Sequence, residues 1–159
     1  MEKNVIISVI GNQTTEHGDS NALELVTEGK YYKEGNTYYV KYNESEVTGL
    51  EGTTTTIKID NDVVTLMREG SVNSQFVFQK GRKHISYYDT AHGAFVIGIF
   101  ANNVDIKMDD SGGEISIDYQ IDIDNNSTGN NDFHMSVREV GNSNDKSYWK
   151  HEGNYCKSN

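Results

Sequence analysis

The chain has 159 residues, which is the ordinary size of one domain and is long enough to bury a core without disulfides or a structural metal. Its formal net charge of −10 repels nucleic-acid phosphates and anionic lipid headgroups, so we expect neither nucleic acid nor a membrane as a partner. The single cysteine, Cys156, cannot form a disulfide within the chain, which fits a reducing compartment and predicts a cytoplasmic protein.

Strand-like runs follow one another from the N-terminus onward. Val5–Ile10 is apolar but too short to be the core of a signal peptide or to span a bilayer, so it is predicted to be a strand. In residues 38–42, Tyr or Val occupies every second position, and residues 53–59 are rich in β-branched side chains, which suit a pleated sheet. Residues 76–78 continue the pattern with two Phe side chains flanking a Val.

The clearest alternation runs from Glu114 to Asp124, where Ile and Tyr occupy the odd positions and acidic or polar residues the even ones. Because successive side chains of a strand point to opposite faces, one face is wholly apolar and the other is acidic. Residues 104–108 and 133–137 repeat this pattern. No segment has sustained helical periodicity, so the chain is predicted to be all-β.

Turn signals rich in Gly, Asn and Asp separate these runs, for example at residues 34–36, 60–62 and 110–113. About ten strand-like runs joined by such short turns favour an antiparallel up-and-down β-barrel, because closure removes the exposed edges of the sheet. A β-sandwich is the alternative. We predict one barrel domain at residues 1–140 and a polar C-terminal tail at residues 141–159.

Two charged residues fall on apolar faces. Glu44 has the parity of Tyr42 and Val40, and Arg68 has the parity of Leu66. A lone buried charge costs several kcal/mol, so each of the two needs a partner, and Arg with a carboxylate suits a low dielectric. The pair is either a polar anchor for a ligand carboxylate or phosphate, or a structural ion pair or strand-end charge.

The phase of residues 84–90 is ambiguous. One phase turns the row His84, Ser86, Tyr88 and Thr90 toward the interior, where Tyr88 would contribute an apolar body and a hydroxyl. The other phase turns Ile85 and Tyr87 inward and leaves this row in water; we favour the phase with Tyr88 inside.

No motif for a metal or a cofactor occurs. The five histidines have no metal-ligand spacing, and the sequence holds no Gly-rich phosphate loop, nucleophile elbow or Cys-x-x-Cys. We therefore expect neither a metal nor a cofactor. The histidines are His17, His84, His92, His134 and His151.

Several short motifs follow one another in order between residues 3 and 140. They are Thr27–Tyr31, Tyr39–Ser45, Leu66–Gly70, Phe76–Gly81, Tyr88–Gly93 and Tyr119. In order and spacing they resemble the YwiB-like family of uncharacterised firmicute proteins, which adopt a calycin (lipocalin-like) β-barrel. The resemblance implies that fold and a cytoplasmic setting, and it brings no established activity.

Three functions are open. The first is the binding of a small apolar or amphipathic molecule in the barrel interior, since a barrel of about eight strands has room for one small ligand. The second is a structural or interaction protein whose barrel is filled by its own side chains. The third is a hydrolase that uses Glu44, His84 or Asp89 as acid or base. The candidate ligand-binding residues are Tyr42, Glu44, Arg68, Phe76, Phe78, Tyr88, Thr90, Tyr119 and Phe133.

Overall fold

Extended backbone accounts for nearly the whole chain from Glu2 to Glu139. The computed structural model describes residues 2–15, 18, 20–140 and 156–158. In this part of the chain the strands are β1 (Glu2–Thr14), β2 (Ser20–Glu34), β3 (Thr37–Asn43), β4 (Thr53–Asp60), β5 (Val63–Gly70), β6 (Ser74–Gln79), β7 (Lys83–Thr90), β8 (Gly93–Asp109), β9 (Gly112–Ile123), β10 (Asn126–Glu139) and β11 (Cys156–Ser158).

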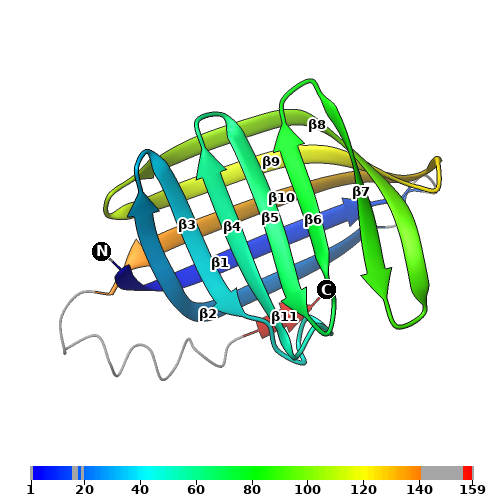
Figure 1. The fold of residues 1–159 in the computed structure, drawn as a ribbon. Helices are drawn as coiled ribbons and strands as arrows, with labels where there is room; N and C mark the ends of the chain where they lie inside the picture. The colour runs from blue at the N-terminus through cyan, green and yellow to red at the C-terminus, as the bar shows by residue number, and fades with distance from the viewer. Residues whose placement is uncertain (1, 16–17, 19, 141–155, 159) are drawn as a thin grey trace.

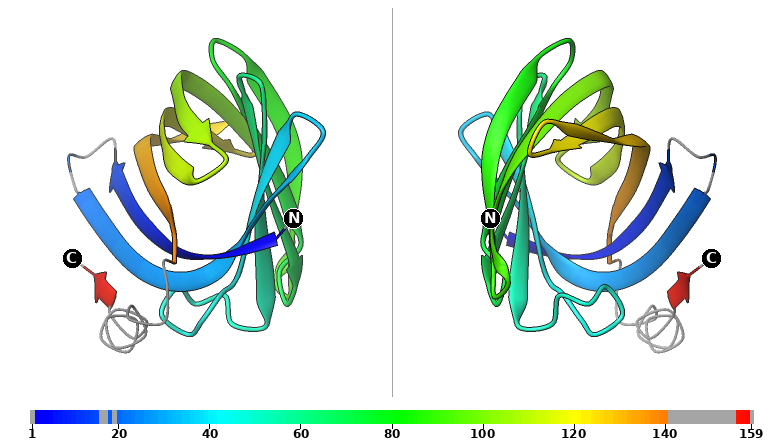
Figure 2. Two further views of the ribbon diagram at one scale, coloured as in Figure 1. Left: turned by 90° about the vertical axis from the view of Figure 1, so that its left-hand side faces the viewer. Right: turned by 90° about the vertical axis from the view of Figure 1, so that its right-hand side faces the viewer.

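The strands form one antiparallel sheet that rolls up into a nearly closed barrel (Figure 1). Their order is β6-β5-β4-β3-β2-β1-β10-β9-β8-β7, so strands that follow one another in the chain pair within β1–β6 and within β7–β10, and β1 also pairs with β10. Figure 2 shows the sheet curving around a central axis from both sides. The predicted all-β, up-and-down barrel is confirmed, and the sandwich alternative is not what forms.

In the described part of the chain, the barrel wall is interrupted between β6 and β7. These strands are consecutive in the chain, yet within the described residues they share no continuous ladder. An isolated bridge joins Asn73 to Asp89, where the Asp89 amide donates to the Asn73 carbonyl at 3.3 Å. A second bridge joins Lys80 to Ala101. Figure 1 shows β7 running at an angle to β6. We use the word seam for this gap.

The alternation of the sequence builds the core. On β9 the odd positions face inward: Ile115 and Ile117 are fully buried, and Ile121 is half-buried against the core. Val40 on β3 and Met135 on β10 are also fully buried. The face predicted to be apolar is therefore the inner face of the barrel.

A β-bulge on β8 explains why the alternation of this long strand changes phase. Ile97 and Ile99 are buried at odd positions, whereas Val104 and Ile106 pack against the core at even positions. The register with β9 shifts between Ala101 and Asn103, where one extra residue is inserted. Such a bulge moves every later side chain to the opposite face, so the two apolar runs both reach the interior.

The predicted tail, residues 141–159, lies outside the described residues except for Cys156–Ser158. These three residues form β11, which pairs with Leu23–Leu25 of β2. The domain boundary at residue 140 stays a prediction. Among the described residues no helix is long and apolar enough to cross a membrane.

Candidate functional site

The barrel interior contains a cavity of about 180 Å³ between the sheet walls of β4, β5, β6, β8, β9 and β10. Five of the nine predicted site residues line it, namely Arg68, Phe76, Phe78, Tyr119 and Phe133. The other lining residues are aliphatic Ile, Val and Leu side chains. The cavity is thus an apolar space with one charged group and one phenol on its described walls.

The strand period places these groups on the wall. On β5, Val64, Leu66 and Arg68 share the inward face, with Arg68 nearest the end of the strand. On β6, Phe76 and Phe78 face inward in the same way, and the Phe78 ring meets the Tyr119 ring edge-on at 4.9 Å between centroids. Aromatic side chains therefore line the cavity from β6, β9 and β10, and Arg68 lines it from near the end of β5.

Glu44 and Arg68 meet, as their parity predicted. The Glu44 side chain is 1% exposed, and its Oε2 lies 3.8 Å from the Nε atom of Arg68, whose side chain is 21% exposed. Thr55 donates a hydrogen bond from its hydroxyl to Oε2, and Thr48 donates one to Oε1 at 3.1 Å. The carboxylate is thus held by two hydroxyls and compensated by one guanidinium.

Arg68 is less well satisfied than its partner. Its Nε atom is buried and has no hydrogen-bond partner among the described residues, because 3.8 Å to Glu44 exceeds hydrogen-bond distance. A buried donor without an acceptor is unusual in a folded protein and calls for an explanation. At this site the explanation can be an acceptor that a ligand supplies.

Tyr42 belongs to the wall beside the ion pair and does not line the cavity. It is buried, and burial raises the pKa of its hydroxyl, with the charge of nearby Glu44 adding to the effect. Burial also raises the pKa of Tyr119, while the positive charge of Arg68 opposes the shift. Both phenols therefore stay neutral well above physiological pH and offer hydroxyl groups, not charges.

The structure gives the phase of β7. His84, Ser86 and Tyr88 are half-buried, whereas Ile85 is 56% exposed and Tyr87 is 72% exposed. The inward-facing Tyr88 packs against Phe76 across the seam, with ring centroids 6.0 Å apart.

Tyr88 therefore lies next to the cavity without lining it. The last candidate of this row, Thr90, ends β7, and its side chain lies outside the described part of the structure.

The three candidate hydrolase groups do not form one catalytic arrangement. Glu44 is held in the interior by Thr55 and Arg68. His84 contacts Gln79 at 3.1 Å between Nε2 and Oε1 at the other end of β7 from Asp89. Because His84 and Asp89 are an odd number of residues apart on one strand, their side chains point to opposite faces of the sheet.

The described histidines have ordinary partners. His134 contacts the Ser116 hydroxyl at 2.8 Å and Glu114 at 3.1 Å, all on the outer face of β9 and β10. His17 and His151 lie outside the described residues. Where the structure is described, no group of three or more His, Cys, Asp or Glu side chains could hold a metal ion.

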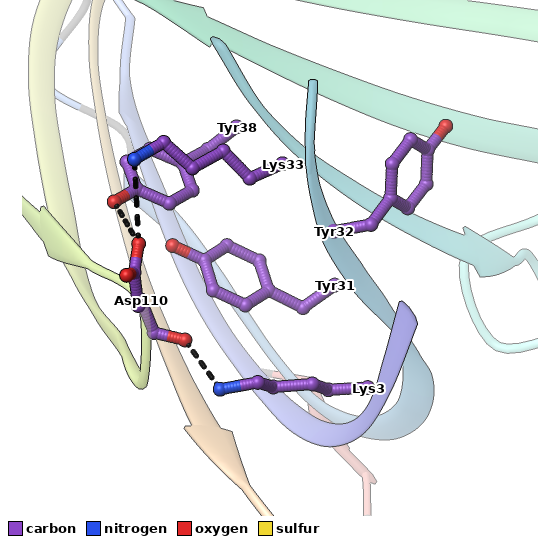
Figure 3. A pocket seen from close by; sticks show the side chains of 6 residues that line it. All are labelled: Lys3, Tyr31, Tyr32, Lys33, Tyr38 and Asp110. Atoms are coloured by element: carbon purple, nitrogen blue, oxygen red, sulfur yellow. Dashed lines mark hydrogen bonds and ion pairs between the residues drawn. The ribbon is translucent and has the colours of Figure 1, made fainter. Parts of the chain in front are cut away.

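A second cleft, of about 300 Å³, lies at the end of the barrel where β1 begins (Figure 3). Tyr38 donates a hydrogen bond to the Asp110 carboxylate at 2.7 Å, and the Lys33 ammonium lies 3.5 Å from the same oxygen. Lys3 donates to the Asp110 backbone carbonyl at 2.8 Å, and Tyr31 donates to the neighbouring carbonyl of Asp109 at 2.5 Å.

These contacts tie the β8–β9 turn to β1, β2 and β3. The polar groups of the cleft therefore satisfy one another, and Figure 3 shows the sixth lining residue, Tyr32, pointing away from them. The rings of Tyr31 and Tyr38 stack with their centroids 5.4 Å apart, which adds an aromatic contact between β2 and β3 at this end of the barrel. These contacts hold the β8–β9 turn in place. We call the group Lys3, Tyr31, Lys33, Tyr38 and Asp110 the Asp110 latch.

Comparison with known proteins agrees with this architecture. The family described as "Domain of unknown function (DUF1934)" matches residues 7–135. This chain belongs to that family. A relative of this chain is the "Uncharacterized beta-barrel protein YwiB" of Bacillus subtilis (strain 168). It is 27% identical over 106 residues, which cover 67% of this chain and 73% of YwiB. The resemblance to the YwiB-like family is confirmed.

The crystal structure of the ywiB protein from Bacillus subtilis superposes with a TM-score of 0.79. It is 22% identical, and the match covers 88% of this chain and 94% of that protein. At this identity the likeness supports the barrel fold. What the DUF1934 barrel binds or does must be argued from the cavity and its side chains.

Sequence reasoning missed several polar residues of this DUF1934 barrel. Thr55 shares the parity of Ile57, and this inward threonine was a usable signal for a partner of Glu44. Ser74 shares the parity of Phe76 and was equally readable. Thr48 lies in the β3–β4 loop, where no strand period indicates the direction of a side chain.

Proposed function

We propose that this barrel binds one small, largely apolar molecule in its interior cavity, with a polar group of the ligand at Arg68. The observation that carries the proposal is the apolar cavity of about 180 Å³ whose charged wall residue has a buried nitrogen without a hydrogen-bond partner among the described residues. Ligand sites combine such apolar walls with a few polar groups that fix orientation.

The size of the cavity limits the ligand. An engineered apolar cavity of about 150 Å³ in another protein accepts benzene, so this cavity has room for one benzene-sized body. The ligand is therefore smaller than the lipids or pigments that larger barrels hold. The calycin-like fold implied by the sequence motifs agrees with ligand binding, but the likeness is one of fold alone.

Toluene is a direct probe of the cavity. We expect toluene to shift the amide resonances around Leu66 and Ile117 and to raise the melting temperature, because it binds the folded state alone. Ile121→Trp, which fills the cavity, removes both effects, whereas Ile10→Trp on the outer face keeps them. Unchanged toluene binding in Ile121→Trp, or no binding to the unmodified protein, contradicts the proposal.

Native mass spectrometry of protein purified from its own host gives the mass of any molecule that remains bound. A bound mass that disappears in Ile121→Trp identifies the occupant of the cavity. The same mass in both proteins indicates a molecule bound elsewhere.

A structural or interaction protein is the second candidate. The observation that favours it is that Glu44 and Arg68 already neutralise each other's charge without a ligand. On this view Arg68 serves stability alone, and ligand screens of the unmodified protein stay blank while Arg68→Met unfolds more easily.

We also propose a cytoplasmic setting for this function. Its support is the single cysteine of the chain, which leaves no cysteine pair for an internal disulfide. Fractionation of the host, followed by detection of the protein with an antibody, tests the setting.

A further inference from the structure

Arg68 is not the sole unsatisfied donor at the seam. Ser74 lies directly opposite Arg68 in the β5–β6 ladder, and both side chains have the inward parity of their strands. The Ser74 hydroxyl oxygen, like Arg68 Nε, is buried and has no hydrogen-bond partner among the described residues. Directly opposite side chains of an antiparallel pair stand about 5 Å apart at Cβ, so one small group can reach both.

The two donors stand where the cavity meets the surface. Arg68 lines the interior cavity and also an open groove of about 590 Å³ along the seam, whose lining includes Ser74. A ligand with its apolar body in the cavity therefore has its polar end at these two residues. Phe76, which lines the cavity, and Tyr88 pack against each other beside them.

The charges around the donors disfavour an anion. Glu44 already compensates Arg68 from 3.8 Å. Glu69 and Asp89 line the same groove as Arg68, so the charge balance of the groove is negative even before Glu44 is counted. Arg68 and Ser74 thus lack a hydrogen-bond acceptor, and they do not lack a negative charge.

We propose that the polar end of the ligand is an uncharged hydrogen-bond acceptor, such as the carbonyl oxygen of an amide, ketone or ester, which accepts from Arg68 Nε and from the Ser74 hydroxyl. This inference rests on the proposed function and names the chemical class of its ligand. It differs from the ligand carboxylate or phosphate that was one of the two alternatives left open by the sequence, because the sequence did not show that Glu44 already compensates the charge of Arg68.

Three probes that share a phenyl ring separate the alternatives: toluene, phenylacetamide and phenylacetate at pH 7. Their affinities are measured by titration calorimetry or ligand-observed NMR. Toluene reports the cavity alone, phenylacetamide adds a neutral acceptor and phenylacetate adds an anion. We expect phenylacetamide to bind about three- to tenfold tighter than toluene, the range that one net hydrogen bond supplies. We expect phenylacetate to bind more weakly than phenylacetamide, because Glu44, Glu69 and Asp89 oppose an anion.

Ser74→Ala tests the assignment of the second donor, with Ser136→Ala on the outer face of β10 as the matched control. We expect Ser74→Ala to weaken phenylacetamide about three- to tenfold and to leave toluene unchanged, while Ser136→Ala changes neither. Circular dichroism and melting of each variant show that the barrel is intact.

The outcomes are distinct. Equal or tighter binding of phenylacetate, or unchanged binding of phenylacetamide to Ser74→Ala, overturns the head-group inference and leaves the cavity proposal standing if toluene binds. If none of the three probes binds, the proposed function fails and this inference fails with it.

Discussion

Removing Arg68 tests whether Glu44 depends on it. In Arg68→Met an apolar side chain of similar length replaces the guanidinium, and the Glu44 carboxylate, whose side chain is 1% exposed, loses its compensating charge. Breaking a buried ion pair by removing one partner costs about 3–5 kcal/mol. Thr55 and Thr48 still donate to the carboxylate, so we expect a loss near the lower end, about 3 kcal/mol.

The assay is equilibrium unfolding in urea, followed by far-ultraviolet circular dichroism, with a thermal melt beside it. For a chain of this length, each kcal/mol lowers the melting temperature by roughly 2–4 °C, so Arg68→Met should melt roughly 6–12 °C below the unmodified protein. The matched control is Arg82→Met, because Arg82 is exposed in the short β6–β7 connection and should shift stability by less than about 0.5 kcal/mol.

A double-mutant cycle isolates the pair. Glu44→Gln removes the buried charge but keeps a side chain that can accept from Thr55, so Glu44→Gln combined with Arg68→Met should be more stable than Arg68→Met alone. A free energy of unfolding for Arg68→Met within about 0.5 kcal/mol of the unmodified protein would refute the reasoning, since Glu44 would then need no partner.

Two further predictions concern pH. Burial raises the pKa of Tyr42 above the ordinary value of 10.0, so the folded state keeps a proton that the unfolded chain releases, and stability falls as pH rises above about 10. Tyr42→Phe should make this fall shallower by about 1.4 kcal/mol per pH unit. Parallel curves of unfolding free energy against pH for the two proteins would contradict the prediction. In the latch, the hydrogen bond from Tyr38 and then the charge of Lys33 hold the pKa of Asp110 below its usual value, so its contribution to stability is present at neutral pH and is lost as pH falls below about 4. Asp110→Asn should lower the free energy of unfolding at pH 7 and make its loss below about pH 4 less steep. A loss of stability in acid as steep as that of the unmodified protein would argue against the latch.

The fold could be predicted from the sequence because one physical signal repeats on most strands. On β9 the alternation runs unbroken from Glu114 to Ile123, and burial follows it residue by residue until the strand reaches the open end of the barrel, where Ile123 becomes 37% exposed. On β8, in contrast, the alternation alone misleads. There the bulge at Ala101–Asn103 reverses the phase, and only pairing with β9 defines it.

The ion pair of the site could also be predicted, since parity alone placed Glu44 and Arg68 on inner faces. Parity gives the face of a residue but not its neighbour across the ladder, which depends on register. Ser74 illustrates the limit: its inward direction follows from Phe76, whereas its position opposite Arg68 follows from the β5–β6 register. Tyr42 and Tyr88 show the same limit, because both face inward and neither reaches the cavity.

The seam links the topology to the unsatisfied donors. The bridge between Asn73 and Asp89 sets an antiparallel register in which Tyr88 would stand opposite Ser74 if the ladder continued. Within the described residues the ladder stops at that bridge, and Tyr88 packs against Phe76. In this part of the chain Ser74 therefore has Arg68 as its cross-strand neighbour on β5 and lacks a ladder neighbour on the β7 side, whereas Arg68 has Thr55 on one side and Ser74 on the other.

Leaving two buried donors unpaired costs about 1–3 kcal/mol each, which is large beside the usual 5–15 kcal/mol stability of a domain. Continuing the β6–β7 ladder or replacing Ser74 with Ala would remove part of that cost without disturbing the core. A cost of this size at the seam, beside an apolar cavity, supports the proposal that a ligand supplies the acceptor for Arg68 and Ser74.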